Sequence, residues 1–144
     1  MLKVKHLDAR RKDHWQQMMV VVAKAAPPTV TITDVILDRV RSALLAGELD
    51  GWLFSNGTPM GIALTMIRED RLLGKRELII YAAANLREMS VGDWDQCFVK
   101  MRLHSLSKGC THMACYTVVP RIMEMAQRMG GDINTRYVSI PLGG

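Results

Sequence analysis

Four residues of the types that bind metals gather within a short stretch of the sequence: His104, Cys110, His112 and Cys115. Imidazole and thiolate groups are ligands that zinc prefers, in tetrahedral sites built from closely spaced pairs. Side chains alternate along a strand, however, so His112 and Cys115 would point to opposite faces of the strand predicted there. We therefore interpret the cysteines as packed thiols and the histidines as exposed or hydrogen-bonded, and we predict no metal site.

Nucleophilic catalysis is the second chemistry that these residue types offer. Cys97 falls on the apolar stripe of a predicted helix, where burial keeps a thiol protonated and inert. No base is obviously paired with Cys110, and adjacent acids such as Glu69 and Asp70 are typical of solvated loops. The sequence therefore predicts no catalytic residue.

Basic residues crowd the first dozen positions, where Asp8 is the only acid. Such an arm could contact nucleic acid or an acidic protein surface, and a solvated start of a helix is the alternative. The next predicted helix presents a tryptophan. We therefore predict a partner-binding surface made of Lys3, Lys5, Arg10, Arg11, Lys12 and Trp15.

Composition places the chain among ordinary globular proteins. It has 144 residues, of which 49% are hydrophobic and 23% charged, enough for about one domain with a substantial core. No apolar run approaches the roughly 20 residues that a membrane span needs, and the N-terminus does not read as a secretory signal. Three cysteines form an odd set, which favours free thiols over a disulfide framework. We expect a cytoplasmic protein.

The N-terminal third predicts two helices. Apolar residues recur at three- and four-residue spacing over residues 7–26, and Pro27-Pro28 ends that helix. A second helix begins near Thr33-Asp34, which can cap exposed amides, and ends at Gly47.

A hairpin is the clearest local signal that follows. The apolar segments 52–54 and 60–67 flank Asn56-Gly57, a pair that tolerates positive φ at both central turn positions. A third strand follows at residues 77–83, so that antiparallel strands precede any crossover.

The remaining chain alternates helices and strands. Ser90 and Asp93 form a capping box at the start of a helix over 91–108, which carries two apolar stripes and so should be buried on more than one face. A helical crossover makes the next strand parallel to the strand at 77–83. The remaining predicted elements are a strand at 112–118, a helix at 121–129 and a closing strand at 136–142.

This order of elements resembles the GNAT superfamily, the GCN5-related N-acetyltransferases, over about residues 35–142. Segments 44–65 and 107–110 look most like GNAT-like proteins of tailed bacteriophages, some of which are virion components. The resemblance implies an α+β fold with a mixed, mostly antiparallel sheet flanked by helices, and an extra N-terminal helix. We expect residues 1–30 to form the basic arm and helix, and residues 31–144 to form the GNAT-like domain.

The resemblance also implies an acyl-CoA site, and this chain departs from it in two places. Family members carry a glycine-rich turn whose amides bind the pyrophosphate, but residues 85–93 contain one glycine and the acids Glu88 and Asp93. Many members place a catalytic tyrosine where this chain has Ala126, and the asparagine often found ahead of that helix is absent. If acyl-CoA binds, the residues expected to hold it are Arg87, Ser90, Val91 and Gly92.

We therefore expect a non-enzymatic GNAT-like structural or interaction protein with no cofactor. Its expected partners are proteins of a larger assembly, plausibly the head or tail of a phage particle, which would place it in the virion. An acyl-CoA-dependent N-acyltransferase using acetyl-CoA is the first alternative. A nucleic-acid-contacting accessory protein acting through the basic arm is the second.

Overall fold

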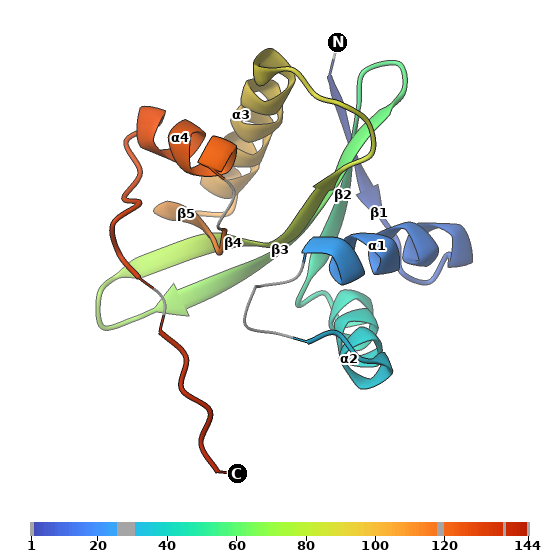
Figure 1. Cartoon of the computed structure of the whole chain (residues 1–144), viewed down its shortest axis with the longest axis horizontal. Helices are drawn as coiled ribbons and strands as arrows, with labels where there is room; N and C mark the ends of the chain where they lie inside the picture. Colours follow the sequence, from blue (N-terminus) through green and yellow to red (C-terminus); the bar gives the residue numbers. More distant parts are fainter. Residues whose placement is uncertain (1, 26–30, 118–119, 137, 144) are drawn as a thin grey trace.

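A computed structural model describes residues 2–25, 31–117, 120–136 and 138–143. Its strands form one sheet in the order β1-β2-β3-β4-β5 (Figure 1). The first four are antiparallel neighbours, and β5 is parallel to β4. This confirms the mostly antiparallel sheet and its one parallel pair. The bounds are β1 (Lys3–Leu7), β2 (Asp50–Ser55), β3 (Pro59–Asp70), β4 (Lys75–Asn85) and β5 (His112–Cys115).

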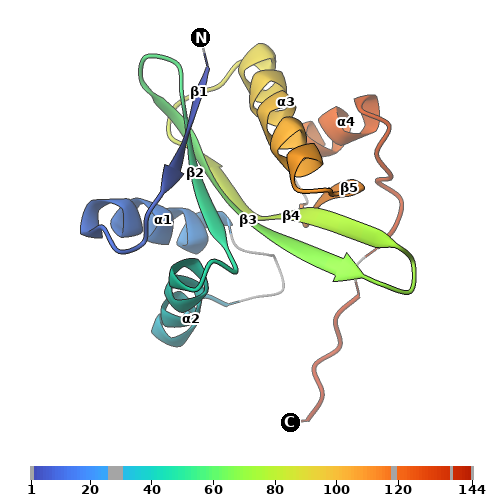
Figure 2. The same cartoon turned by 180° about the vertical axis from the view of Figure 1, so that it is seen from behind.

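Helices cover both faces of the sheet, so the predicted α+β class is confirmed. Figures 1 and 2 show α1 and α2 on one face, and α3 and α4 together on the other. Helix α3 makes the crossover from β4 to β5. The bounds are α1 (Lys12–Ala25), α2 (Asp34–Leu45), α3 (Val91–Ser107) and α4 (Pro120–Arg128).

Short polar motifs set the ends of these elements where the sequence predicted them. The Thr33 hydroxyl accepts a hydrogen bond from the Ile36 amide at 3.3 Å and caps α2. Gly47 follows α2 with φ of +78°. Gly57 takes positive φ in the β2–β3 hairpin, whereas Asn56 does not, so the hairpin is confirmed with one left-handed residue instead of two.

Two apolar cores lie on the two faces of the sheet. The core under α1 and α2 is centred on Met18, Val22 and Leu64, which are fully buried. The core under α3 contains Leu78 and Met101 and includes residues of β2 and β3. The sheet is thus packed on both sides, as its long apolar strands require.

The sequence missed the first strand. Residues 3–7 pair with β2, from Lys3 opposite Ser55 to Leu7 opposite Gly51, and the first helix begins at Lys12 instead of residue 7. Alternating lysines and apolar residues suit an edge strand, but their charge suggested an arm. Pro27-Pro28 and the expected domain boundary at residue 30 lie outside the described residues, so that boundary stays a prediction.

The C-terminal end departs most from expectation. Residues 136 and 138–142 form no strand, and Tyr137 lies outside the described residues. Strand β5 ends at Cys115, short of the predicted residue 118, which is also not described. The second apolar stripe of α3, at Val99, Leu103 and Leu106, is exposed instead of buried. Among the described helices, none is long and apolar enough to cross a membrane.

Candidate functional site

The central feature of the site is the end of β4, where β5 no longer accompanies it. Pairing of the two strands covers Glu77–Ile80 against His112–Cys115, and β4 then continues to Asn85. Among the described residues, no strand runs beside the last five residues of β4 on that side. Main-chain groups at a sheet edge can pair with an extended ligand. The end of β4 is therefore a candidate binding edge.

A bulge lies where that edge begins. Ile80 faces Thr65 and Ala82 faces Leu64, so Tyr81 is an extra residue in β4. The extra residue of a bulge stands outside the regular ladder, and bulges are common next to active sites. The Tyr81 side chain packs against the core under α1 and α2, where burial raises the pKa of its phenol.

The N-terminus of α3 follows β4 after a short loop. The predicted capping box is confirmed: the Ser90 hydroxyl accepts from the Asp93 amide at 3.1 Å, and the Asp93 carboxylate accepts from the Ser90 amide at 3.0 Å. Val91 and Gly92 form the first turn and are exposed. A helix N-terminus attracts anions through its amides and its dipole.

The negative charge of Asp93, which the sequence suggested would repel a diphosphate, is partly compensated. Its carboxylate is held by the cap, and the Arg87 guanidinium lies 3.8 Å away. Arg87 also donates to the Glu88 carbonyl at 3.1 Å. Its Nε is buried and has no hydrogen-bond partner among the described residues.

A second arginine reaches the same loop from α4. Arg121 donates to the Met89 carbonyl over 3.4 Å, across 32 positions of sequence. Two guanidinium groups thus flank the loop before α3, and guanidinium groups suit phosphate oxygens. The sequence singled out Arg87 but not Arg121, because only the return of α4 beside α3 brings Arg121 there (Figure 1).

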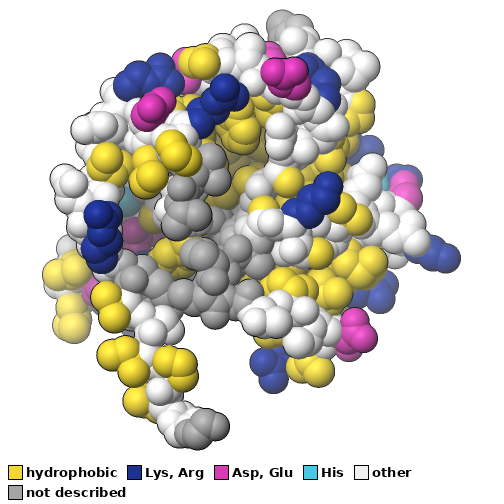
Figure 3. Space-filling model, in the orientation of Figure 1, with side chains coloured by type: hydrophobic (Ala, Val, Ile, Leu, Met, Phe, Trp, Pro, Cys, Tyr) yellow, Lys and Arg dark blue, Asp and Glu magenta, His cyan; other side chains and the backbone are white. Residues whose placement is uncertain are grey.

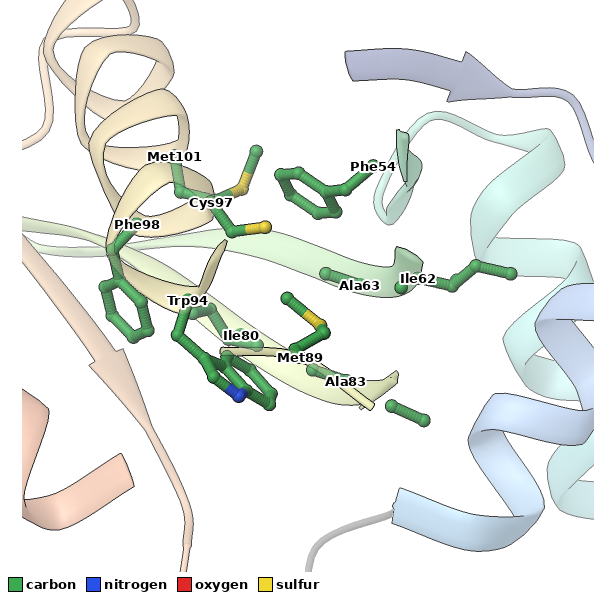
Figure 4. Close-up of a pocket in the computed structure, with 12 residues that line it drawn as sticks. Phe54, Ile62, Ala63, Ile80, Ala83, Met89, Trp94, Cys97, Phe98 and Met101 are labelled. Atoms are coloured by element: carbon green, nitrogen blue, oxygen red, sulfur yellow. The ribbon is translucent and has the colours of Figure 1, made fainter. Parts of the chain in front are cut away.

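A small apolar cavity lies between α3 and the sheet, beside the same end of β4. Its volume is about 50 Å³, and Figure 4 shows Met89, Trp94 and Phe54 around it. None of the described residues that line it carries a charge. The complete lining is Phe54, Gly61, Ile62, Ala63, Ile80, Ala83, Ala84, Met89, Trp94, Cys97, Phe98 and Met101.

The candidate metal ligands and cysteines are dispersed. No group of three or more His, Cys, Asp or Glu in the described part of the chain could hold a metal ion. Burial raises the pKa of Cys97 to about 11 and also raises the pKa of Cys115. Both thiols therefore stay protonated near neutral pH and are poor nucleophiles. The His104 ring lies edge-on to Trp52, at 4.6 Å between ring centroids.

The basic residues near the N-terminus do not join this site. Lys3 and Lys5 lie on the edge strand β1, and Lys12 begins α1. Two arginines pair with neighbouring acids, Arg10 with Asp8 at 3.0 Å and Arg11 with Asp13 at 3.1 Å. Trp15 is half-buried against the core, and the guanidinium of Arg41 lies 5.7 Å from its ring centre. A partner-binding role for this set stays a prediction.

The comparisons with known proteins concern the fold. No protein-family model matches the sequence, and no curated protein matches it significantly. Solved structures do match, over nearly the whole chain. An aminoglycoside N-acetyltransferase, AAC(6')-Iy, bound to the bisubstrate analogue CoA-S-monomethyl-acetylneamine, has a TM-score of 0.70 and 16% identity, covering 100% of this chain and 99% of that one. The chain has the GNAT fold.

Two further GNAT structures agree. An aminoglycoside acetyltransferase from an uncultured soil metagenomic sample, in complex with sisomicin, has a TM-score of 0.72 and 12% identity, covering 99% of this chain and 97% of that one. A predicted acetyltransferase from Clostridium acetobutylicum, with acetyl-CoA, has a TM-score of 0.71 and 9% identity, covering 98% and 96%. At these identities the likeness shows the fold.

These neighbours contradict the leading functional prediction. They are acetyltransferases, and two of the complexes contain a CoA derivative or acetyl-CoA. The predictions of a non-enzymatic phage component and of no cofactor are therefore wrong, and the acyl-CoA alternative is favoured. Both predictions rested on the missing glycines of the turn before α3. The open edge of β4, its bulge and the position of Arg121 arise only in the folded chain, so the sequence did not reveal them.

Proposed function

We propose that the protein is an acyl-CoA-dependent N-acyltransferase. The observation that carries the proposal is the open end of β4, with its bulge at Tyr81, leading directly into the α3 N-terminus between Arg87 and Arg121. An edge that can pair with amide groups thus adjoins an anion-binding helix end. Coenzyme A has amides in its pantetheine arm and a diphosphate beyond them, so the two parts of the site match the two parts of the ligand.

Each part of the site has a role in this proposal. Residues 81–85 offer main-chain groups to the pantetheine arm, as an edge strand does to an added strand. The amides of Val91 and Gly92, with Arg87 and Arg121, face the diphosphate. The lone glycine of the turn is then less of an obstacle, because the two guanidinium groups approach a phosphate through side chains instead of bare backbone.

The reaction proposed is transfer of an acyl group to an amine. The amine nitrogen attacks the thioester carbon, the new N–C bond forms, the C–S bond breaks, and the sulfur leaves as thiolate while the amine loses a proton to solvent. The buried Met125 and its neighbour Ala126 provide no phenol on α4 to protonate the sulfur. A thiol with an ordinary pKa of about 8.5 leaves without such help, so catalysis rests on positioning.

Titration calorimetry with acetyl-CoA tests the proposal. We expect the wild-type chain to bind, and Arg121→Ala to bind about ten- to a hundredfold more weakly, since a hydrogen bond to a charged group contributes roughly 1.5–3 kcal/mol. Arg102→Ala is the matched control, because Arg102 is exposed on α3. Mass spectrometry of a panel of primary amines incubated with acetyl-CoA would then detect the acylated product. The absence of binding heat for the wild-type chain would overturn the proposal.

A further inference from the structure

The bulge at Tyr81 turns two residues of β4 toward the cavity under α3. Residues three apart on a regular strand point to opposite faces of the sheet. Because Tyr81 is an extra residue, Ile80 and Ala83 instead lie on the same side, and both line the cavity. Tyr81 and Ala82 pack against the core under α1 and α2. The open end of β4 therefore also forms one wall of the cavity.

Helix α3 forms the opposite wall of the cavity. Its lining residues recur at three- and four-residue spacing and so share one face of the helix: Trp94, Cys97, Phe98 and Met101. Figure 4 shows this row of side chains facing the strands. The described side chains around the cavity are aliphatic, aromatic or sulfur-containing. A cavity of this kind offers few partners to water and takes apolar groups, so it suits a hydrocarbon chain.

The cavity is closed at one end and reaches the surface at the other. Phe54 and Met101 lie at one end in Figure 4 and are buried, whereas Ile80 and Trp94 lie at the other end and are half-buried. Among the described residues, no strand runs beside β4 after Ile80 on this side, so the half-buried end faces the edge that β5 leaves open. Figure 3 shows a hollow below α3 with hydrophobic side chains inside it. A group held at the open edge can therefore extend into the cavity.

We propose that this cavity holds the acyl group of the donor, and that the protein prefers short acyl groups of three or four carbons over acetyl. The proposal rests on the acyl-CoA-dependent function given above, because it places the thioester carbonyl at the open end of β4 and the hydrocarbon chain in the cavity.

The volume of the cavity sets the length of the chain. An apolar cavity of about 150 Å³ holds benzene, so a cavity of about 50 Å³ has room for about two carbons. Counting these carbons from the carbonyl gives a propionyl group, and counting them from the methyl carbon of an acetyl group gives a butyryl group. An acetyl group alone would leave much of the cavity empty and forfeit contacts with its lining.

Titration calorimetry of the full chain with CoA, acetyl-CoA, butyryl-CoA and octanoyl-CoA tests the acyl preference. We expect butyryl-CoA to bind about tenfold more tightly than acetyl-CoA, since it buries two more methylene groups in an apolar site. Octanoyl-CoA should bind more weakly than butyryl-CoA, because the closed end of the cavity stops the longer chain.

Two substitutions change the volume of the cavity in opposite directions. Ala63→Val adds two carbons to the cavity from β3 and should reduce the preference for butyryl-CoA over acetyl-CoA to about threefold or less. Phe98→Ala enlarges the cavity and should make octanoyl-CoA the tightest ligand. Val99→Ala, at the exposed neighbour of Phe98 on α3, is the matched control and should keep the wild-type order of affinities. Circular dichroism checks that the variants fold.

The outcomes separate this inference from the proposed function. The absence of binding heat with every ligand would overturn both. Equal affinities of the wild-type chain for CoA, acetyl-CoA and butyryl-CoA would overturn the acyl preference alone, and so would a wild-type chain that binds octanoyl-CoA most tightly. A preference for butyryl-CoA that Ala63→Val leaves unchanged would place the acyl chain outside the cavity and also overturn the inference.

Discussion

The two faces of the sheet differ in how completely they are packed. Under α1 and α2, Met18, Val22 and Leu64 have no exposed surface. On the α3 side, a cavity of about 50 Å³ remains beside β4, and the stripe at Val99 and Leu103 faces solvent. The burial of these side chains contributes to the stability of the fold. The second face has the cavity and the α3 N-terminus that belong to the proposed acetyl-CoA site, so substitutions on the two faces should have separable effects.

The largest expected effect on stability comes from removing the Met18 side chain from the core under α1 and α2, which we call the closed face; the side covered by α3 is the open face. Met18→Ala should lower the free energy of unfolding by about 2–5 kcal/mol, because a fully buried side chain leaves a cavity. Urea denaturation measures the change. Val20→Ala, half-exposed on the same helix, should change stability by less than about 0.5 kcal/mol. Similar losses for the two variants would show that the burial of Met18 is not what stabilises the packing of α1 on the sheet.

Substitutions at the N-caps of α2 and α3 should have a smaller effect on stability and separate the two faces further. Ser90→Ala on the open face and Thr33→Ala on the closed face should each cost about 1 kcal/mol of stability, since each removes an N-cap acceptor. Only Ser90→Ala should also weaken acetyl-CoA binding in calorimetry, because it disturbs the amides of the α3 N-terminus. Equal weakening by Thr33→Ala would show that the effect is general destabilisation.

The smallest expected effect is on how folding stability depends on pH. The hydrogen bond from the Arg68 guanidinium, at 2.8 Å, lowers the pKa of the buried Glu77 carboxyl, and Lys75 at 3.4 Å adds to it. Because the folded pKa lies below the unfolded one, the ion pair stabilises the fold above the unfolded pKa. That contribution is lost as pH falls through the folded pKa.

Urea denaturation at a series of acidic pH values measures this loss. Glu77→Gln should have a flatter slope of unfolding free energy against pH in the acid range. Glu69→Gln, at an exposed carboxylate on β3, should keep the wild-type slope. A wild-type slope in Glu77→Gln would mean that other carboxylates account for the acid sensitivity.

Local motifs made much of the fold predictable. Thr33 before α2, the Ser90–Asp93 box and Gly57 in the hairpin each act within a few residues, so the sequence alone locates these ends. The parallel pairing of β4 and β5 followed from the helical crossover. Strand β1 was missed because it pairs with β2, which lies far away in the sequence, from Lys3 opposite Ser55 to Leu7 opposite Gly51. Its lysines also suggested a solvent-exposed arm.

The candidate site was predictable only in part. Arg87 and Ser90 lie in the loop and cap where the sequence placed them. Arg121 arrives through the packing of α4, and the bulge at Tyr81 depends on register against β3. The predicted closing strand at 136–142 shows the opposite limit: its alternation is visible in the sequence, but residues 136 and 138–142 form no strand, because alternation alone does not supply a neighbouring strand.

The central claim is that acetyl-CoA binds along the unpaired end of β4 and at the α3 N-terminus. Amide hydrogen exchange with and without acetyl-CoA tests it most directly, because it measures the protection of each backbone amide there. The account predicts slower exchange at residues 81–85 of β4 and at Val91 and Gly92 in the presence of acetyl-CoA, with no change in α1. Unchanged exchange at both segments, at acetyl-CoA concentrations that saturate any measured binding, would contradict it.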